Sequence, residues 1–426
     1  MKTQKDTEHR YIAGGSLLAA VLAIVLTAWA PASFAVDVGE ELANMFKNGD
    51  FDVNFRYRYE WVDQDDNGKK SGNASTLRTR LVFKTAKWND FDVTINMDDV
   101  RTIVADDYNS TRNGKTQYQT IADPKGTDLN IAALTWSGIE NTTVIAGRQR
   151  IIRGNARFIG NVGWRQNEQT YDALSANYKS ERFSANYAYI DRVNRIFGPE
   201  AGTPTEKFNS DSHIFDAGYT LSHVMTITAY AYLLEFENAQ AASNDTYGAR
   251  IQGAPKISDD FTITYAAEYA TQEENSNKNP VAYDADYILA ELGFKAGIFS
   301  LKAGYELLEA DETAGVAFQT PLATLHAHNG WADKFLATPA DGLEDIYIAG
   351  SAKLGKGTLT LVLHDFSSDV GSTDYGQEID FAAKWPLGDH YSILGKLAFY
   401  NGDSNAPAGS LAQDTTKAWL MFTAAF

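Results

Sequence analysis

The stretch FDVNFRYRYEW, residues 51–61, decides the fold, because apolar or aromatic residues fill every second position. The positions between them, residues 52, 54, 56, 58 and 60, are Asp, Asn, Arg, Arg and Glu. Successive side chains of a β-strand point to opposite faces, so this segment has one apolar face and one charged face. A strand of this kind fits a soluble sandwich or a barrel in a membrane.

Segments of about ten residues with similar alternation recur along the chain, which is the length that a tilted strand needs to cross a membrane. We count eighteen, with sixteen as the alternative count. We therefore expect an all-β antiparallel transmembrane barrel over residues 51–426. The eighteen segments are 51–62, 74–87, 90–104, 128–138, 142–152, 169–179, 182–193, 211–222, 224–237, 245–257, 261–272, 285–296, 299–310, 344–354, 358–368, 375–386, 391–402 and 414–426.

The links between these segments favour a membrane barrel over a sandwich, because they alternate in length. Short links such as 179–181 and 355–357 predict periplasmic turns, whereas polar links such as 153–168 and 311–343 predict extracellular loops. The loops at 106–127 and 311–343 are long enough to fold inward as constrictions, or they cap the outer rim. The last strand ends in an aromatic residue, as the closing strand of bacterial outer-membrane barrels does. Aromatic residues predicted to face the membrane interfaces are Trp61, Trp88, Trp136, Tyr171, Trp385, Tyr391 and Tyr400.

The start of the chain predicts export. A basic stretch from Lys2 to Arg10 precedes an apolar run over residues 11–30, and Ser33 and Ala35 supply small residues at positions −3 and −1 of a cleavage site. We predict a signal peptide at residues 1–35 and a short periplasmic segment at residues 36–50. An uncleaved anchor is the alternative, because the run is near the minimum of about 17 residues for a spanning helix. The expected location is the bacterial cell outer membrane.

Composition excludes several classes of function. The chain has 37 Lys and Arg against 55 Asp and Glu, so its net charge is −18 and a nucleic-acid-binding surface is not expected. Loss of the leader removes three basic and two acidic groups, which gives −18 − 1 = −19. The absence of cysteine excludes disulfides, thiolate metal sites and cysteine nucleophiles. We expect no cofactor.

Arginine is distributed unevenly. Of 16 arginines, 14 lie between residues 56 and 195, and Arg250 is the only one after them. A lumen lined with guanidinium groups favours anions, because arginine stays charged and binds carboxylates with two parallel hydrogen bonds. The alternative is that cross-strand pairs with Asp and Glu only stiffen the wall. The predicted pore-lining and substrate-binding residues are Arg56, Arg58, Arg78, Arg80, Arg148 and Arg150 in the wall, with Arg153, Arg157 and Arg165 near the external mouth.

The region 147–174 carries a family resemblance. It contains GRQR at 147–150, GNAR at 154–157, GNVGWR at 160–165 and TYDAL at 170–174. This pattern resembles the alginate-export family of outer-membrane porins. The resemblance implies an eighteen-stranded barrel with a basic lumen, and the best-known members secrete the polyuronate alginate.

The expected function is passage of an anionic carbohydrate, either export of an alginate-like polyuronate or diffusion of acidic sugars. Expected partners are outer-membrane lipid, the anionic oligo- or polysaccharide and periplasmic export components. A general porin, or a scaffold or adhesin with a plugged lumen, is the alternative. No enzyme is expected: His326 and His328 share one face of an extended segment, but no serine elbow or third metal ligand accompanies them. The pattern Asp63-x-Asp65-x-Asn67-Gly68 lacks the acid at position twelve of a calcium loop, so we expect a polar hairpin tip and no metal site.

Overall fold

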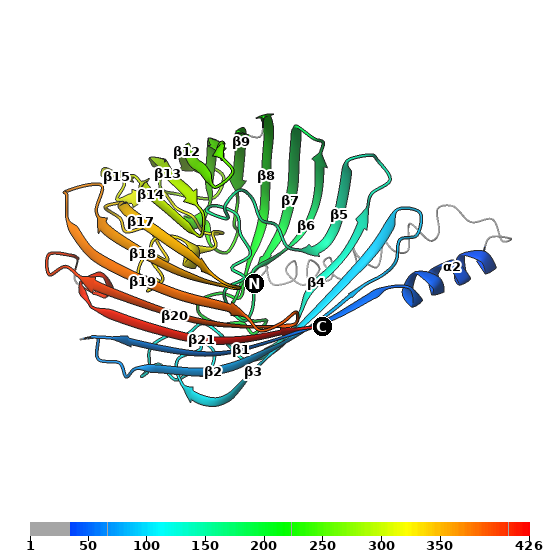
Figure 1. The fold of residues 1–426 in the computed structure, drawn as a ribbon, viewed down its shortest axis with the longest axis horizontal. Coiled ribbons are helices and arrows are strands. Elements are labelled where there is room, and N and C mark those ends of the chain that lie inside the picture. The colour runs from blue at the N-terminus through cyan, green and yellow to red at the C-terminus, as the bar shows by residue number, and fades with distance from the viewer. Residues whose placement is uncertain (1–34, 66, 223, 408) are drawn as a thin grey trace, which may run out of the picture.

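The computed structural model describes residues 35–65, 67–222, 224–407 and 409–426. One α-helix, α2 (Ala35–Lys47), precedes the strands and lies outside the ring that they form (Figure 1). The predicted signal peptide, residues 1–35, lies outside the described residues except for Ala35. Within the described part of the chain, no helix has the length and apolar character needed to cross a membrane.

Helix α2 is attached to the barrel beside the turn between the second and third strands. The backbone N–H of Ala86 donates to the carbonyl of Met45 at 3.0 Å. The Phe46 ring stacks on Phe83 with 6.1 Å between the ring centroids. Residues 36–50, predicted as a short periplasmic segment, form most of this helix and the connection to the first strand.

Eighteen antiparallel strands form one closed sheet, as the alternation predicts, so the count of eighteen is confirmed over sixteen. Short β11 (Lys256–Ser258) continues β10 along the same neighbour, β12. The eighteen strands are β1 (Asp50–Gln64), β2 (Gly72–Lys84), β3 (Phe91–Asp107), β4 (Gly126–Trp136), β5 (Thr142–Gln149), β6 (Thr170–Lys179), β7 (Phe183–Asn194), β8 (Lys207–Ser222), β9 (Met225–Leu234), β10 (Asn244–Gly253), β12 (Phe261–Glu274), β13 (Asp284–Ala296), β14 (Phe299–Leu308), β17 (Leu343–Leu354), β18 (Gly357–Ser367), β19 (Asp374–Pro386), β20 (Tyr391–Gly402) and β21 (Thr415–Ala425).

The first and last strands close the barrel. β1 pairs with β21 from Asn54 opposite Ala425 to Gln64 opposite Thr415. Phe426 extends the ladder, because its backbone exchanges two hydrogen bonds of 2.9 Å with Val53. The first and last strands therefore leave no free edge where they meet, as a sheet that spans a membrane requires.

The two faces of each strand differ as the alternation predicts. In β1, Phe51 and Phe55 are 60% and 37% exposed on the outer face, whereas Arg58 and Glu60 are buried inside. In β21, Leu420 and Phe422 face outward and Trp419 is buried. The outer face is therefore apolar and suited to lipid, and the inner face carries the charges.

Two predicted membrane-facing aromatics lie inside the barrel instead. Trp385 and Tyr391 are about two fifths exposed, as expected, but Tyr171 and Tyr400 are buried. The Tyr171 hydroxyl donates to the carbonyl of Gly160 at 2.6 Å, so it holds a loop inside the lumen. The prediction was wrong for Tyr171 and Tyr400 because it counted position along the strand and not the face of the strand.

The connections alternate as predicted, with short turns such as 180–182 and 355–356 at one end of the barrel. Long loops leave the other end, and parts of three of them fold inward: residues 150–169, residues 309–342 and the segment 121–124. Small elements lie within the loops, namely the 3-10 helices η1 (Gln240–Ala242), η2 (Leu325–Ala327) and η3 (Ser410–Ala412) and the hairpin β15 (Ala310–Asp311) and β16 (Val316–Ala317).

Candidate functional site

Two inward loops, residues 150–169 and residues 309–342, bind to each other inside the barrel. The backbone N–H of Gly160 donates to the carbonyl of Leu322 at 2.8 Å, and that of Thr324 donates to Ala156 at 2.9 Å. A side chain at Gly160 would bring a Cβ to 2.2 Å from the Thr324 hydroxyl, so this approach requires glycine. We call the joined pair of loops the inward unit.

Arginines of β1 hold the inward unit by its carbonyl groups. The Arg56 guanidinium donates to the carbonyl of Gly163 at 2.9 Å and also bonds the carbonyl of Arg165. Arg58 donates to the carbonyl of Trp164, and its guanidinium lies 4.2 Å from the centre of the Trp164 ring. Both arginines are on the inner face, as predicted, but they are occupied by the loop.

Arg165 ties the same loop to the carboxylates around it. Its guanidinium lies 3.1 Å from Glu60 of β1, 3.7 Å from Asp123 and 3.5 Å from Asp333 of the other inward loop. Burial alone would lower the pKa of Arg165, but the charges of Glu60 and Asp123 raise it above its usual value. Arg165 is therefore a buried cation that joins three segments of the chain.

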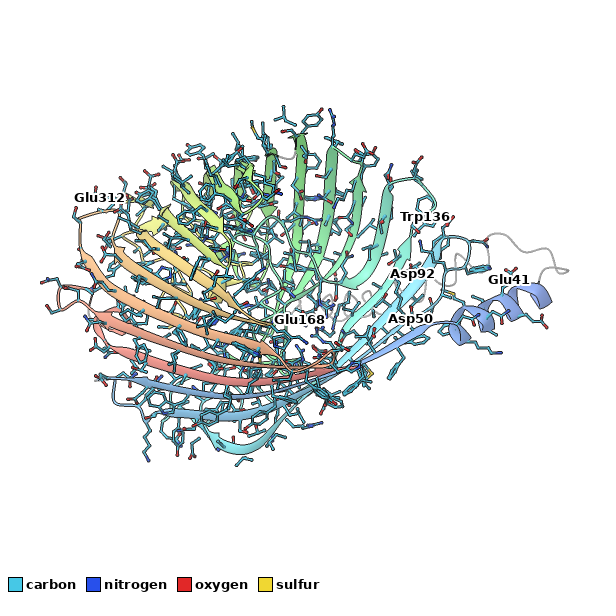
Figure 2. All side chains as sticks on the ribbon, viewed as in Figure 1. Glu41, Asp50, Asp92, Trp136, Glu168 and Glu312 are labelled. Atoms are coloured by element: carbon cyan, nitrogen blue, oxygen red, sulfur yellow. The ribbon has the colours of Figure 1, made fainter. Side chains whose placement is uncertain are left out.

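Arg80 and Arg150 converge on one carboxylate, that of Glu168. Arg80 Nη2 and Arg150 Nε each lie 2.7 Å from Glu168 Oε1, and Arg150 Nη2 donates to the same oxygen. Arg80 also forms two parallel bonds with Asp98, at 2.6 and 2.7 Å. Burial would raise the pKa of Glu168, but the hydrogen bond from Arg150 and the charge of Arg80 outweigh it and lower the pKa to about 2. Figure 2 shows Glu168 within the ring of strands, far from Glu312.

Arg78 is the predicted wall residue with the fewest partners. It is 6% exposed and its Nη2 donates to the Asn54 side chain at 2.8 Å. Its Nε is buried with no partner among the described residues. Arg78 lies directly opposite Arg56 in the ladder of β1 and β2, so two positively charged residues are cross-strand neighbours on the inner face.

The two other loop arginines that sequence placed near the mouth are also in ion pairs. Arg153 lies 3.0 Å from Asp216 of β8. Arg157 is buried, with its Nε donating to Glu306 of β14 at 2.8 Å and its Nη2 donating to Asn329 at 3.0 Å. Both side chains fasten the inward loop to the wall.

Arg148 does not share the inner face with Arg150, contrary to prediction. It lies opposite Asp172, with 2.7 Å between Nε and the carboxylate. Asp172 has the same parity in β6 as Leu174, which is 51% exposed on the outer face, whereas Ser175 is buried inside. The strand ends at Gln149, so the alternation does not continue to Arg150.

Carboxylates, in contrast, dominate the inner face from β12 to β19. Asp380 accepts the backbone N–H of Trp331 at 3.1 Å, and Glu378 accepts that of Ala332 at 2.7 Å. The Asn329 side chain donates to Glu306 at 2.6 Å. The carboxylates of this half are Glu268, Glu291, Glu306, Asp345, Glu378 and Asp380, with Arg250, Lys302 and Lys396 among the cations beside them.

Lys396 of β20 joins that strand to the inward unit, because its ammonium group lies among the indole rings of Trp164, Trp331 and Trp419. Lys396 Nζ lies 3.6 Å from the centre of the Trp331 ring and 4.5 Å from that of Trp164. It also contacts His326 Nε2 at 2.7 Å, and His326 Nδ1 lies 2.7 Å from Asp333. An ammonium can only donate, so His326 accepts at Nε2 and is neutral. Burial is the main cause that lowers the pKa of His326 to about 3, and the charge of Lys396 adds to it.

Sequence reasoning missed the residues that contact the arginines. Glu168 contacts Arg80 and Arg150, Asn130 and Asn161 donate to the Glu168 carboxylate, and Asp123 reaches Arg58 from a third loop. Glu168 follows the GNVGWR motif by three positions, which is the only signal that could have singled it out. Of the two histidines considered as candidate catalytic residues, His326 is buried and His328 is half-buried, and burial also lowers the pKa of His328 to about 4.

Solved structures of outer-membrane porins share this fold. OccK3 (OpdO) of Pseudomonas aeruginosa superposes with a TM-score of 0.67 at 10% identity, covering 91% of this chain and 98% of that one. OccAB2 of Acinetobacter baumannii gives a TM-score of 0.69 at 14% identity, covering 90% and 99%. At such identities the likeness shows the fold alone. No curated protein sequence matches the chain.

A sequence family supplies the assignment that the fold alone does not. The family model described as alginate export matches residues 48–310, which include β1 to β14 and the loop with the GNVGWR motif. The chain therefore belongs to the alginate export family and is a porin-type β-barrel of the bacterial outer membrane.

Proposed function

We propose that this barrel is a channel for anionic carbohydrate, either an alginate-like polyuronate that leaves the cell or acidic sugars that diffuse through. The observation that carries the proposal is the pair of Arg56 and Arg78. They lie directly opposite each other on the inner face, and neither forms an ion pair with a carboxylate among the described residues. Like charges in this position destabilise a sheet, so the wall holds a local excess of positive charge that an anion would relieve.

The neighbouring groups extend this excess. Four guanidinium groups, those of Arg56, Arg78, Arg80 and Arg150, have only Asp98 and Glu168 as carboxylate partners among the described residues. By comparison, Arg58 and Arg165 lie among Glu60, Asp123 and Asp333 and are fully compensated. The uncompensated charge is therefore concentrated on β1, β2 and the end of β5.

The mechanism follows from the chemistry of the guanidinium group. It is weakly hydrated and offers parallel donors that match a carboxylate, so it can replace water around a uronate group. Several such contacts in series let the ligand enter and still leave, as conduction requires. We assign ligand contact to Arg78, Arg80 and Arg150, beside which Arg56 adds its charge. Arg56, Arg58, Arg153, Arg157 and Arg165 act as positioning residues that hold the inward unit.

The test is the current through the refolded mature protein in a planar bilayer. Under a salt gradient the reversal potential should show preference for anions, and short uronate oligomers should block the current in a concentration-dependent way. A preference for cations would indicate a general porin in which the acidic wall dominates. No current at all would indicate a barrel whose inward unit plugs the lumen and whose role is to scaffold partners.

A further inference from the structure

The Glu168 carboxylate occupies the position that a ligand carboxylate would take between Arg80 and Arg150. Oε1 accepts hydrogen bonds from both guanidinium groups and from Asn130, and Oε2 accepts one from Asn161 at 2.8 Å. The side chain is 2% exposed, whereas those of Arg80 and Arg150 are 15% and 31% exposed. Both arginines are therefore partly accessible to solvent, whereas the Glu168 carboxylate that pairs with them is buried.

The three arginines around this carboxylate are unequally paired. Asp98 holds Arg80 from the barrel wall by two parallel bonds. Arg150 has Glu168 as its only carboxylate partner among the described residues. Arg78, two residues from Arg80 on the same face of β2, has a buried Nε without a partner. A carboxylate of a ligand bound beside Arg78, Arg80 and Arg150 could therefore accept from N–H groups to which Glu168 does not bond, such as Arg78 Nε.

The loop does not depend on Glu168 for its position. The Gln166 side chain donates to the Thr76 hydroxyl at 2.9 Å, and that of Gln169 donates to the carbonyls of Gly160 and Leu322 at 2.9 and 3.1 Å. These bonds fix the backbone on both sides of Glu168. The loop backbone therefore has anchors that do not involve the Glu168 carboxylate, and exchange of that carboxylate breaks none of them.

We propose that Glu168 is a displaceable internal ligand, and that the carboxylate of a hexuronate residue exchanges with it at Arg78, Arg80 and Arg150. This inference rests on the proposed passage of anionic carbohydrate. In the resting channel Glu168 compensates the arginines. A uronate restores that compensation when it displaces the glutamate, so the site selects a forked, doubly accepting anion over a halide, which offers no matching pair of oxygens.

The experiment compares block by a uronate trimer in the wild type and in Glu168→Gln, in planar bilayers at fixed salt. Glutamine keeps the size of the side chain and removes the competing charge. Because a hydrogen bond to a charged group contributes about 1.5–3 kcal/mol, the half-blocking concentration should fall by about tenfold or more. Asp172→Asn is the matched control: it removes one of the two carboxylate partners of Arg148 on the outer face and should leave the block unchanged.

The outcomes separate this inference from the function on which it rests. If the wild type prefers anions and is blocked by the trimer, but Glu168→Gln is blocked equally or more weakly, Glu168 is not a competing ligand. If the wild type itself shows no anion preference and no block, the proposed function fails. Should Glu168→Gln not refold, Glu168→Asp serves instead, since its shorter carboxylate reaches the arginines less well and should also tighten the block. An unchanged block in that variant would overturn the inference.

Discussion

The two halves of the barrel wall hold the inward unit with opposite charges. On β1, Arg56 and Arg58 donate to backbone carbonyls of the loop at 150–169. On β19, Glu378 and Asp380 accept backbone N–H groups of the loop at 309–342. The positively charged wall therefore binds backbone C=O groups, and the negatively charged wall binds backbone N–H groups. The loops need few charged side chains of their own at these contacts.

The walls differ in what compensates their charge. In the acidic half, Glu306, Glu268 and Glu291 form ion pairs with Arg157, Arg250 and Lys302, and Glu378 and Asp380 accept backbone N–H groups. The basic half leaves Arg56 and Arg78 without carboxylate partners among the described residues. Charged side chains of the wall can therefore hold a loop on one side of the barrel and remain available for a ligand on the other. The first four predictions probe this contrast, from the largest expected effect to the smallest.

Removal of Arg165 should have the largest effect, because it leaves Glu60, Asp123 and Asp333 with less compensation. Breaking a buried pair by removing one partner costs about 3–5 kcal/mol. Arg148→Ala removes an ion pair on the outer face at a strand end and should cost no more than about 1 kcal/mol. Urea unfolding of both variants, refolded in the same detergent, measures the contrast. Equal losses would mean that the inward unit does not depend on Arg165.

Neutralising the acidic wall should loosen one inward loop. In Glu378→Gln with Asp380→Asn, the N–H groups of Trp331 and Ala332 lose charged acceptors, each worth about 1.5–3 kcal/mol. Single-channel conductance should rise and the reversal potential should move further toward anions. An unchanged reversal potential would show that this wall does not contribute to the field along the ion path, and a shift toward cations would contradict the prediction.

Acid should weaken the contact of the inward unit with β20 before it weakens the contact with the basic wall. The pKa of His326 is lowered from 6.5 to about 3, so the unfolded chain binds more protons between these values and stability falls as the pH drops through that window. The corresponding window for Glu168, whose pKa is lowered to about 2, begins only near 4.5. His326→Gln should therefore flatten the pH dependence of unfolding between pH 6.5 and 4.5. His328, with its pKa lowered to about 4, keeps part of the slope. An unchanged slope in the variant would contradict the neutral state of His326.

The smallest effect on stability is expected for Arg78→Gln. Loss of the charge opposite Arg56 removes a repulsion, so stability should stay constant or rise by up to about 1 kcal/mol, while anion selectivity falls. Thermal unfolding and the reversal potential of the same preparation give both quantities. A clear loss of stability would mean that the arginine has a structural role that its contacts do not reveal.

Sequence alone was sufficient for the strands. Alternation in segments such as 51–62 depends on one face meeting lipid, and this demand is local, so the count of strands and the faces of segments such as this one could be predicted. The arginines of β1 and β2 followed from the same rule. Arg148 did not, because β5 ends one residue later and the face of Arg150 is set by the loop.

The contacts inside the barrel could not be predicted, because they join segments far apart in the chain. Asp123, Glu168 and Asp333 meet the arginines only after three loops have folded inward. Nothing in the spacing of Trp164, Trp331 and Trp419 indicates that they surround Lys396. The sequence therefore indicated the charge of the wall, but not which part of it stays free for a ligand.

The most direct test of the central claim is the reversal potential of two matched double variants under one salt gradient. Arg56→Gln with Arg78→Gln neutralises the pair without carboxylate partners on the basic wall, and Arg250→Gln with Lys302→Gln neutralises a compensated pair on the acidic wall. Anion selectivity should fall strongly in the first variant and little in the second. Equal losses, or a larger loss in the second, would contradict the assignment of the uncompensated positive charge along the ligand path to Arg56 and Arg78.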